Sequence, residues 1–406
     1  MEQLFFELIR VAIGTQDTLS RPPSACEWKE LYNMAKKQSL VGIGFAGLQK
    51  LYNSVNQELS THNPQPNPTK NQEPITQNLD EVQYLTWMGM AAKIQQRNEV
   101  VNQRCIDLQR MLSEDGISNC VLKGQGIAKL YGSDLCNLRQ SGDIDVWCDG
   151  GRERIYKYSM EKLGEISGVN YHHIHFPVFD DTEVEMHIYP SFLSSPLRNK
   201  RLQDFCKLYA PCECKTEEIS TPSLAFNLVF IMLHCYRHLS GHGVGFRQMM
   251  DYYFVLLAAK QMGSKGSMQQ SCGSNGLRIE QPKALNYKQE SLKWVKRLGM
   301  SRFAPALMWV MKEVFGLDDE YLLCEPNEKD GRFLLSEIMQ TGNMGHADER
   351  VDRSKLNSAL GRYIYNFKRD LHVMRICPHE ALWEPWFNLV LYLRRKFIWS
   401  RNYNLK

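Results

Sequence analysis

The chain has 406 residues, of which 43% are hydrophobic and 11% aromatic, so it contains enough apolar material for two or three folded domains. Its 49 Lys and Arg residues against 45 Asp and Glu residues give a formal net charge of only +4. This small charge argues against binding to nucleic acid through bulk electrostatics, and we expect no specific nucleic-acid partner. The 12 cysteines are scattered and lack paired CxxC motifs, which argues against a disulfide scaffold and favours reduced thiols in the cytoplasm.

Residues 1–115 are predicted to form an N-terminal helical region. Apolar residues recur at helical spacing through residues 1–50, and Pro22-Pro23 separates two predicted helices. Residues 53–78 are rich in Asn, Gln, Thr and Pro and contain too few apolar residues to pack, so we predict a flexible insert there. A long helix is expected to follow, from about Leu79 to Asp115.

Residues 116–220 are predicted to form an α/β core. A short apolar strand is followed by a glycine loop, a helix and an acidic strand, and after a further helix two alternating segments around a polar turn indicate a β-hairpin. The predicted elements in order are the strand 118–122, the loop 123–126, the helix 127–131, the acidic strand around 143–146, the helix 152–163, and the hairpin strands 169–179 and 183–189.

Residues 221–406 are predicted to form a C-terminal helical region. Residues 224–239 and 246–259 have helical apolar patterns, and residues 291–315 are expected to continue as helix. Residues 262–289 are dominated by Ser, Gly, Gln and Lys and are predicted to be a second flexible insert. The fold class expected for the whole chain is therefore α+β, a mixed sheet with helices, flanked by helical regions on both sides.

We expect no targeting segment and no membrane-spanning segment at either end of the chain. The first ten residues place acids inside their apolar run, as an amphipathic helix does and a signal peptide does not. Residues 386–393 are apolar but are followed at once by Arg394-Arg-Lys396, so we expect no transmembrane helix. The basic and aromatic residues 394–399 are typical of a peripheral membrane contact, although an amphipathic helix that packs on its own domain explains them as well.

Two acids one residue apart, Asp143 and Asp145, form the most informative pattern in the sequence. Side chains alternate faces along a strand, so both carboxylates point to one side while Ile144 and Val146 point into a core. Like charges about 4 Å apart repel by about 4 kcal/mol at an effective dielectric of about 20, and a bound cation offsets that cost. The pattern therefore predicts a metal site, although a solvated strand end is the simpler alternative.

A third acid on the predicted hairpin makes the metal site more specific. Glu185 lies mid-strand on the face that it shares with Glu183 and His187. If this strand lies next to the acidic strand, three carboxylates meet, and hard divalent cations such as Mg²⁺ prefer oxygen ligands. Pairs of such ions serve phosphoryl and nucleotidyl transfer, which makes that the expected reaction type.

Four motifs together resemble one known family. They are Val121-Leu-Lys-Gly124, Arg139-Gln-Ser-Gly-Asp-Ile-Asp145, Val184-Glu-Met-His187 and Gly243-Val-Gly-Phe-Arg-Gln-Met-Met-Asp251. In this order they resemble the uncharacterised nucleotidyltransferase family of bacteria, within the DNA polymerase β superfamily. The resemblance covers about residues 1–315. Some members of the family are found beside surface-polysaccharide genes.

The resemblance implies a Mg²⁺-dependent transfer, with Mn²⁺ as the alternative ion, of a nucleoside monophosphate from a triphosphate such as ATP to an unidentified hydroxyl or phosphate acceptor. It implies that Asp143 and Asp145 bind both metal ions, and that Glu185 binds one and accepts the proton of the attacking hydroxyl. Nucleotide contacts are expected from Gly124, whose loop lets backbone amides approach the triphosphate, and from the further residues Lys123, Arg139, Ser141, Gly142 and Arg247.

The phosphate loop departs from the superfamily pattern. Lys123-Gly124 replaces the usual Gly-Ser or Gly-Gly pair, so the hydroxyl that helps to hold the phosphate is missing there, and Ser141 is a candidate substitute. The departure keeps a second hypothesis open, a catalytically degenerate transferase that serves as a nucleotide sensor or assembly partner. Two residues also have simpler alternatives: Arg139 would pair with a nearby acid, and Arg247 with Asp251 four residues along a helix.

Histidines support a third hypothesis, a metal-dependent hydrolase. His173 and His175 share a strand face, and His187 is predicted to lie opposite them, so a transition metal held by histidine and Asp or Glu is an alternative to Mg²⁺. His234 and His238 have the i, i+4 spacing of zinc ligands, but the glutamate that follows the first histidine of a metalloprotease motif is absent.

Overall fold

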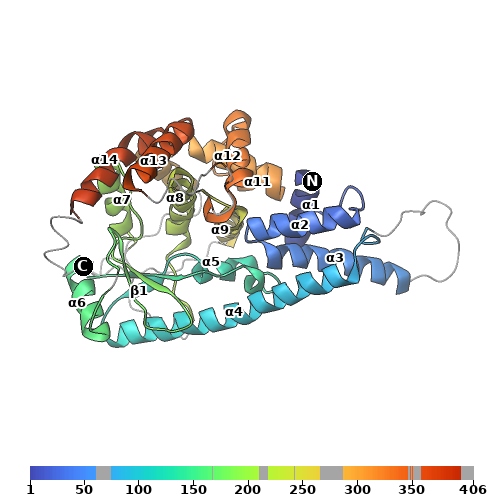
Figure 1. Cartoon of the computed structure of the whole chain (residues 1–406), viewed down its shortest axis with the longest axis horizontal. Helices are drawn as coiled ribbons and strands as arrows, with labels where there is room; N and C mark the ends of the chain where they lie inside the picture. Colours follow the sequence, from blue (N-terminus) through green and yellow to red (C-terminus); the bar gives the residue numbers. More distant parts are fainter. Residues whose placement is uncertain are drawn as a thin grey trace.

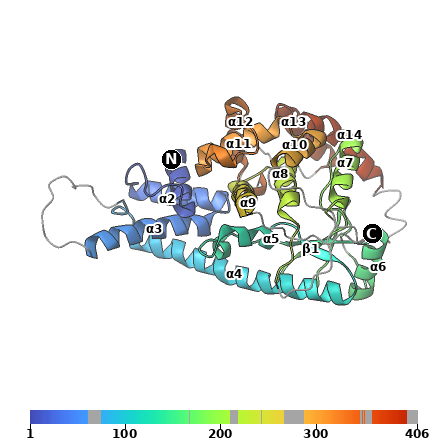
Figure 2. The same ribbon diagram turned by 180° about the vertical axis from the view of Figure 1, so that it is seen from behind.

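The computed structural model describes residues 1–60, 75–166, 168–209, 218–241, 243–265, 287–345, 348, 350 and 358–394; for residues 55–60, 262–265, 359 and 360 it describes the backbone alone. One long helix, α4 (Glu81–Glu114), runs beneath the whole molecule, with N-terminal helices above one end and a small sheet above the other (Figure 1). The view from behind shows the C-terminal helices on the side opposite α4 (Figure 2).

The N-terminal helices are α1 (Glu2–Ile13), α2 (Ala25–Lys37) and α3 (Val41–Ser60), whereas the sequence predicted two over this stretch. Pro22-Pro23 separates α1 from α2 as predicted, but the chain breaks again before α3, where Ser39 has a φ of +55°. The side chain of Ser24 accepts a hydrogen bond from the Glu27 amide while the Glu27 carboxylate accepts one from the Ser24 amide, so a capping box starts α2. Helix α3 continues to Ser60, further than the predicted insert at 53–78 allows, because no proline interrupts the chain before Pro64. Residues 61–74 lie outside the described residues.

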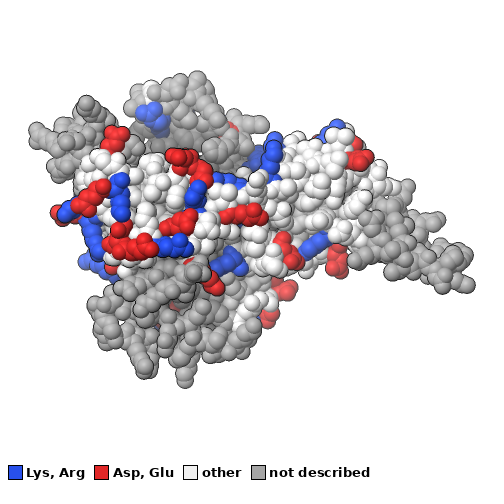
Figure 3. All heavy atoms as spheres, turned by 90° about the horizontal axis from the view of Figure 1, so that it is seen from below, with Lys and Arg blue, Asp and Glu red and all other residues white. Residues whose placement is uncertain are grey.

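Helix α4 has 34 residues, close to the predicted 79–115, and begins where the Asp80 carboxylate accepts a hydrogen bond from the Val82 amide. Near its start, the indole nitrogen of the buried Trp87 donates a hydrogen bond to the Val41 carbonyl at 2.7 Å, which ties α4 to α3. On the underside of the molecule, Lys and Arg alternate with Asp and Glu rather than gathering by sign (Figure 3). Arg104 of α4 forms an ion pair with Asp181, with Nη2 2.8 Å from a carboxylate oxygen.

The sheet has four strands in the order β1-β2-β4-β3, namely β1 (Asn119–Val121), β2 (Ile144–Cys148), β4 (Val184–His187) and β3 (His173–His175). Strand β1 is antiparallel to β2, β2 is parallel to β4, and β3 is antiparallel to β4. The predicted strands and the hairpin are confirmed, although the hairpin strands are shorter than predicted. Helices α5 (Gln125–Ala128) and α6 (Gly151–Leu163), and the 3₁₀ turns η1 (Lys129–Tyr131) and η2 (Cys136–Leu138), complete this region.

Helices make up most of the described C-terminal part. They are α7 (Pro196–Lys207), α8 (Leu224–Gly241), α9 (Phe246–Lys265), α10 (Tyr287–Leu298), α11 (Phe303–Phe315), α12 (Glu328–Thr341), α13 (Ala359–Val373) and α14 (Pro378–Arg394), with 3₁₀ turns η4 (Asp319–Tyr321) and η5 (Asn343–Gly345). The prediction of one helix over 291–315 is wrong, because the chain breaks at Gly299, whose φ of +88° ends α10. Helix α9 extends into the predicted second insert, and residues 266–286 and 395–406 lie outside the described part.

Two apolar cores hold these elements. The larger core joins the N-terminal helices to the C-terminal ones, and Phe6 of α1 meets Phe246 of α9 edge to face with ring centroids 5.8 Å apart. The smaller core lies between the sheet, α4 and α6, and contains the inward residues Val146 and Met186 of β2 and β4. The opposite face of the sheet is therefore left to the acidic and histidine side chains that alternate with these residues.

Candidate active site

Strands β2 and β4 bring two acids side by side. Their parallel register pairs Asp145 directly with Glu185, and pairs Trp147 with His187 two residues further on. Ile144 and Val184 point into the core from the other face, since side chains alternate along each strand. The adjacency predicted for the acidic strand and the second hairpin strand is thus present in the structure.

Asp143 and Asp145 differ strongly in their surroundings. Asp145 is buried, with 2% of its surface exposed, whereas Asp143 precedes β2 and is exposed. The charge of Asp145 raises the pKa of Asp143 to about 6, and desolvation of the carboxyl group acts in the same direction. The repulsion expected between the two acids is therefore present, and it raises the pKa of the outer one, Asp143.

Two cationic side chains hold the inner carboxylate. Lys123 places its Nζ 3.1 Å from one oxygen of Asp145, and His187 places its Nε2 2.7 Å from the other. Burial opposes the charge of Asp145, but Lys123 and His187 outweigh it and leave its pKa far below the ordinary value. Burial likewise disfavours the imidazolium of His187, yet its bonds to Asp145 and Glu185 raise its pKa to about 9.

Histidines surround the second acid. Oε2 of Glu185 lies 3.1 Å from Nδ1 of His173 and 3.4 Å from Nε2 of His187. Burial acts against its charge, but these imidazoles leave the pKa of Glu185 below its ordinary value. Burial lowers the pKa of His173 to about 4, so the two imidazoles differ in charge although they face the same acid.

Potential metal-ligand atoms gather in two overlapping groups of the described residues. In one, single ligand atoms of Asp145, Glu185 and His187 lie within 4.8 Å of one another; in the other, those of His172, His173 and His187 do so. The histidine site predicted from the sequence consists of His173, His175 and His187, and the structure brings His172 there in place of His175. The run His172-His173 carried the missing signal, because it places one histidine on the strand and one at its entrance.

The loop after β1 requires glycine. Gly124 has φ of +58° and ψ of −116°, a combination that residues with a Cβ rarely adopt. Its carbonyl accepts hydrogen bonds from the amides of Ile127 and Ala128, which turns the chain into α5. The same loop positions Lys123 against Asp145, so the departure from the superfamily motif places a cation inside the acid cluster.

The loop before β2 lies against α9. Arg247 of α9 donates from Nη1 to the Gln140 carbonyl at 3.1 Å, and a Cβ built on Gly142 would lie 3.8 Å from the same nitrogen. The Nε of Arg247 is buried without a hydrogen-bond partner among the described residues. Ser141 is half-buried and Gly142 is exposed, so this loop and Arg247 form one side of the site. Their contacts to nucleotide stay predictions.

Arg139 is already engaged with an acid. Its Nε and Nη2 donate to the two carboxylate oxygens of Asp251 at 2.7 and 2.8 Å, and the hydroxyl of Tyr131 donates to the same carboxylate at 2.7 Å. Asp251 therefore pairs with Arg139 rather than with Arg247, the partner that helical spacing suggested. The bidentate pair clamps the loop before β2 to α9, and nucleotide binding by Arg139 stays a prediction.

Helix α4 fixes the same loop from below. The amide nitrogen of Asn98, which is fully buried, donates to the carbonyls of Asn137 at 2.7 Å and Arg139 at 2.8 Å. Six residues further along α4, Arg104 binds Asp181 in the hairpin turn, with its Nη2 2.8 Å from a carboxylate oxygen. A single helix thus holds both segments that carry the acids.

Helix α8 forms another wall. Burial lowers the pKa of His234 well below its ordinary value, and the charges of Lys123, Arg247 and Arg139 act in the same direction. His234 is therefore a neutral imidazole within range of the charges of the site. Its ring meets that of His238 edge to face with centroids 4.3 Å apart, so the two histidines of the i, i+4 pair contact each other.

The donor set fits a divalent cation. Asp145 and Glu185 offer oxygens within 4.8 Å of each other, and a cation would replace the contacts that Lys123 and His187 now make. Asp143 belongs to neither group of ligand atoms, but it lies near enough for the charge of Asp145 to raise its pKa. Carboxylates suit Mg²⁺, and an imidazole in the set also admits Mn²⁺ or Zn²⁺.

Comparison with known proteins agrees with this chemistry. The model of one protein family, described as uncharacterised nucleotidyltransferase, matches residues 24–271. The matched span includes every candidate site residue, from Lys123 to Arg247. No curated protein and no solved structure matches the chain.

Proposed function

The chain belongs to this family of uncharacterised nucleotidyltransferases, and from that premise we propose that it is a Mg²⁺-dependent enzyme that transfers a nucleoside monophosphate from a nucleoside triphosphate to a hydroxyl or phosphate acceptor. The observation that carries the proposal is the register of β2 and β4, which pairs Asp145 with Glu185 and leaves Asp143 two residues away on the same strand. We place the reaction in the cytoplasm, with an acceptor from surface-polysaccharide metabolism.

In this transfer an acceptor oxygen bonds to the α-phosphorus, the bond from that phosphorus to the bridging oxygen breaks, and pyrophosphate leaves. Asp143, Asp145 and Glu185 are proposed to hold Mg²⁺ or Mn²⁺, which neutralises charge on the phosphates. Glu185 is the proposed acceptor of the proton from the attacking hydroxyl. Lys123, Arg247 and the backbone at Gly124 are proposed to bind the phosphates; Ser141, Gly142 and Arg139 shape the adjoining loop.

Calorimetry with ATP, GTP, CTP and UTP, each with Mg²⁺, tests the proposal. We expect at least one triphosphate to bind, and Asp143→Asn to weaken that binding by about 10- to 100-fold, as the loss of a metal contact does. Asp149→Asn is the matched control, because Asp149 is an exposed acid at the other end of β2. Equal binding by wild type and Asp143→Asn, or no binding of any triphosphate, would contradict the proposal.

Mass spectrometry then identifies donor and acceptor together. Cell extract incubated with the protein and a labelled triphosphate is expected to contain a component that gains the mass of one nucleotide. Chelation of divalent ions is expected to abolish the gain, and Asp149→Asn to preserve it.

A second candidate is a degenerate transferase that binds nucleotide without turnover. The contact between Lys123 and Asp145 favours it, because a side-chain cation already occupies the position next to the inner carboxylate. Pyrophosphate release in cell extract that depends on Asp143 would exclude this candidate.

The cluster of His172, His173 and His187 favours a third, a metal-dependent hydrolase. That candidate requires zinc, iron or manganese in the purified protein, which elemental analysis detects.

A further inference from the structure

Helices α13 and α14 turn their apolar sides away from the protein. On α13 the exposed apolar residues recur at i, i+1, i+4 and i+8, which is one stripe of a helix, and their exposed fractions lie between 45% and 53%. On α14 Trp386 is 65% exposed and Leu382 61%, within a second stripe. The two stripes consist of Tyr363, Ile364, Phe367 and Leu371 on α13 and of Leu382, Trp383, Trp386, Leu389, Val390 and Leu393 on α14.

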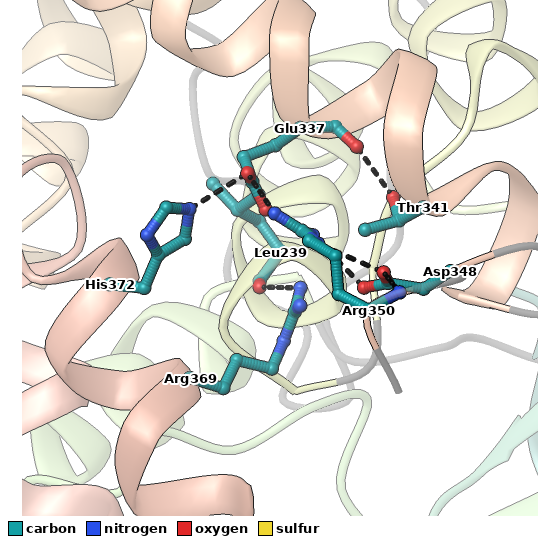
Figure 4. A network of polar contacts seen from close by, with 7 residues as sticks. All are labelled: Leu239, Glu337, Thr341, Asp348, Arg350, Arg369 and His372. Carbon is teal, nitrogen blue, oxygen red and sulfur yellow. Dashed lines mark hydrogen bonds and ion pairs between the residues drawn. The ribbon is translucent and has the colours of Figure 1, made fainter. Parts of the chain in front are cut away.

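The opposite sides of both helices carry charged groups that face inward. Arg369 of α13 is buried and donates from Nη2 to the Leu239 carbonyl of α8 at 2.6 Å (Figure 4). Glu380 of α14 is fully buried; it accepts a hydrogen bond from the Ser194 amide at 2.9 Å and pairs with Arg237 at 2.8 Å. A surface helix of a water-soluble domain normally buries its apolar side. Helices α13 and α14 instead bury charged groups and expose apolar stripes.

The charges left on the surface of the pair have one sign. Within residues 358–394 the three acids, Asp370, Glu380 and Glu384, are buried or half-buried, whereas the exposed charged residues are Arg362, Lys368 and Arg394. In the sequence Arg395-Lys396 follows directly. Tryptophan and tyrosine are also frequent among the exposed residues, and these side chains prefer the boundary between lipid headgroups and acyl chains. This surface therefore combines apolar and aromatic residues with charged residues that are all basic. Such a combination favours binding to a layer of anionic lipids.

We propose that α13 and α14 bind in the plane of a membrane that contains anionic lipids, with the two apolar stripes in the headgroup region. Within the described ranges, no helix is long and apolar enough to cross a bilayer. Helix α14, with 17 residues, is about 26 Å long, which suits a segment that lies flat. The inference stands apart from the proposed transfer reaction, because none of its residues belongs to the acid cluster.

Flotation of the full chain with lipid vesicles tests the inference. We expect binding to vesicles of phosphatidylcholine mixed with phosphatidylglycerol and weak binding to phosphatidylcholine alone. Trp386→Ala with Leu389→Ala is expected to lower partitioning by at least about tenfold, since two apolar anchors are lost. The control is Val82→Ala with Leu85→Ala, two exposed apolar residues of α4 on the other side of the molecule, which should partition as wild type.

Two further measurements test the contribution of the basic residues and the depth to which the tryptophans enter the lipid. Arg362→Gln with Lys368→Gln is expected to lower binding to the anionic vesicles by about tenfold and to leave binding to phosphatidylcholine unchanged. Brominated lipids should quench the tryptophan fluorescence of the unmodified protein, a measurement that needs no variant. Equal binding by wild type and the Trp386/Leu389 variant would overturn the inference. A lipid-free dimer that this variant converts to a monomer, with no vesicle binding by wild type, would also overturn it and assign the stripes to a second copy of the chain.

Discussion

The acid cluster and the α13–α14 pair both bury carboxylates, but they treat the charge in opposite ways. Asp145 and Glu185 contact cationic or imidazole partners, and the pKa of each is lowered despite burial. Under the helix pair, burial raises the pKa of Glu380 although Arg237 contacts it, and raises the pKa of Asp370 to about 7. The sheet keeps its inner acids ionised at neutral pH, whereas the helix pair makes ionisation costly.

This difference separates acids that could bind a metal ion from acids that lie beneath a helix pair at the surface. Acids that stay ionised near exposed strand ends can exchange a side-chain cation for a metal ion, and Lys123 and His187 are the partners that would be exchanged. Beneath the helix pair, by contrast, ionisation of the buried acids costs free energy, so the stability of the pair depends on their protonation. We therefore expect the stability of the sheet region to depend mainly on its ion pairs. The stability of the helix pair should depend mainly on the protonation of its buried acids.

Removal of the acid that clamps α9 to the site should have the largest effect on stability. Asp251→Asn leaves Arg139 buried without its carboxylate, which is expected to cost about 3–5 kcal/mol of unfolding free energy, measured by urea denaturation. The double variant Arg139→Met with Asp251→Leu should regain much of the loss, because no charge stays buried. Arg104→Met breaks the exposed pair with Asp181 and should have a far smaller effect, because water screens exposed charges. If Asp251→Asn destabilised the protein no more than Arg104→Met, the expected difference between the buried pair and the exposed pair would be contradicted.

Asp370 gives the helix pair a dependence on pH. Its folded pKa of about 7 exceeds the value near 3.9 in an unfolded chain, because burial and the charge of Glu384 oppose ionisation more than Arg369 and Arg237 favour it. A raised folded pKa means that the contribution of this group is most favourable below about pH 4 and is lost as the pH rises to about 7. Asp370→Asn should therefore raise the unfolding free energy by about 1–3 kcal/mol at pH 8 and change it little at pH 4.

Thermal unfolding of wild type and Asp370→Asn across that range measures the difference. Asp149→Asn, which changes an exposed acid, should parallel wild type at every pH. A difference between Asp370→Asn and wild type that stays constant with pH would mean that the Asp370 carboxyl does not titrate between pH 4 and 7.

The smallest effect is expected at the glycine loop. Gly124→Ala should cost about 1–2 kcal/mol from backbone strain alone, because a Cβ at this position would approach no closer than 3.9 Å to another atom. Gly89→Ala, in the middle of α4 and facing open space, should raise stability by up to about 1 kcal/mol. Circular dichroism during denaturation compares the two, and an equal sign of their effects would contradict the assignment of strain to Gly124.

The sequence predicted local elements and the acid cluster because both follow from short-range patterns. Alternation identified the hairpin, and period two placed Asp143 and Asp145 on one face. The adjacency of Glu185 needed one further assumption, that the second hairpin strand lies beside the acidic one. That assumption is correct because the apolar residues of both strands share one core.

The contacts that the sequence could not supply join residues far apart in the chain. Arg139 and Asp251 are separated by 112 residues, whereas the i, i+4 rule offered only Arg247 as a partner for Asp251. The reversed packing of α13 and α14 was equally hidden, because periodicity shows that a helix has an apolar side but not which side faces the protein. The break at Gly299 required knowledge of its backbone angle.

Helix α4 also gives the molecule a mechanical property. Its 34 residues form a rod about 51 Å long, held near one end through Trp87 and at its middle through Asn98. A tilt of about 5° around the middle would move each end by about 2 Å, which exceeds the roughly 0.5 Å within which the groups of a metal or catalytic site must be held. The N-terminal helices and the loop before Asp143 are thus fastened to one rod, at points about 17 Å apart along its axis.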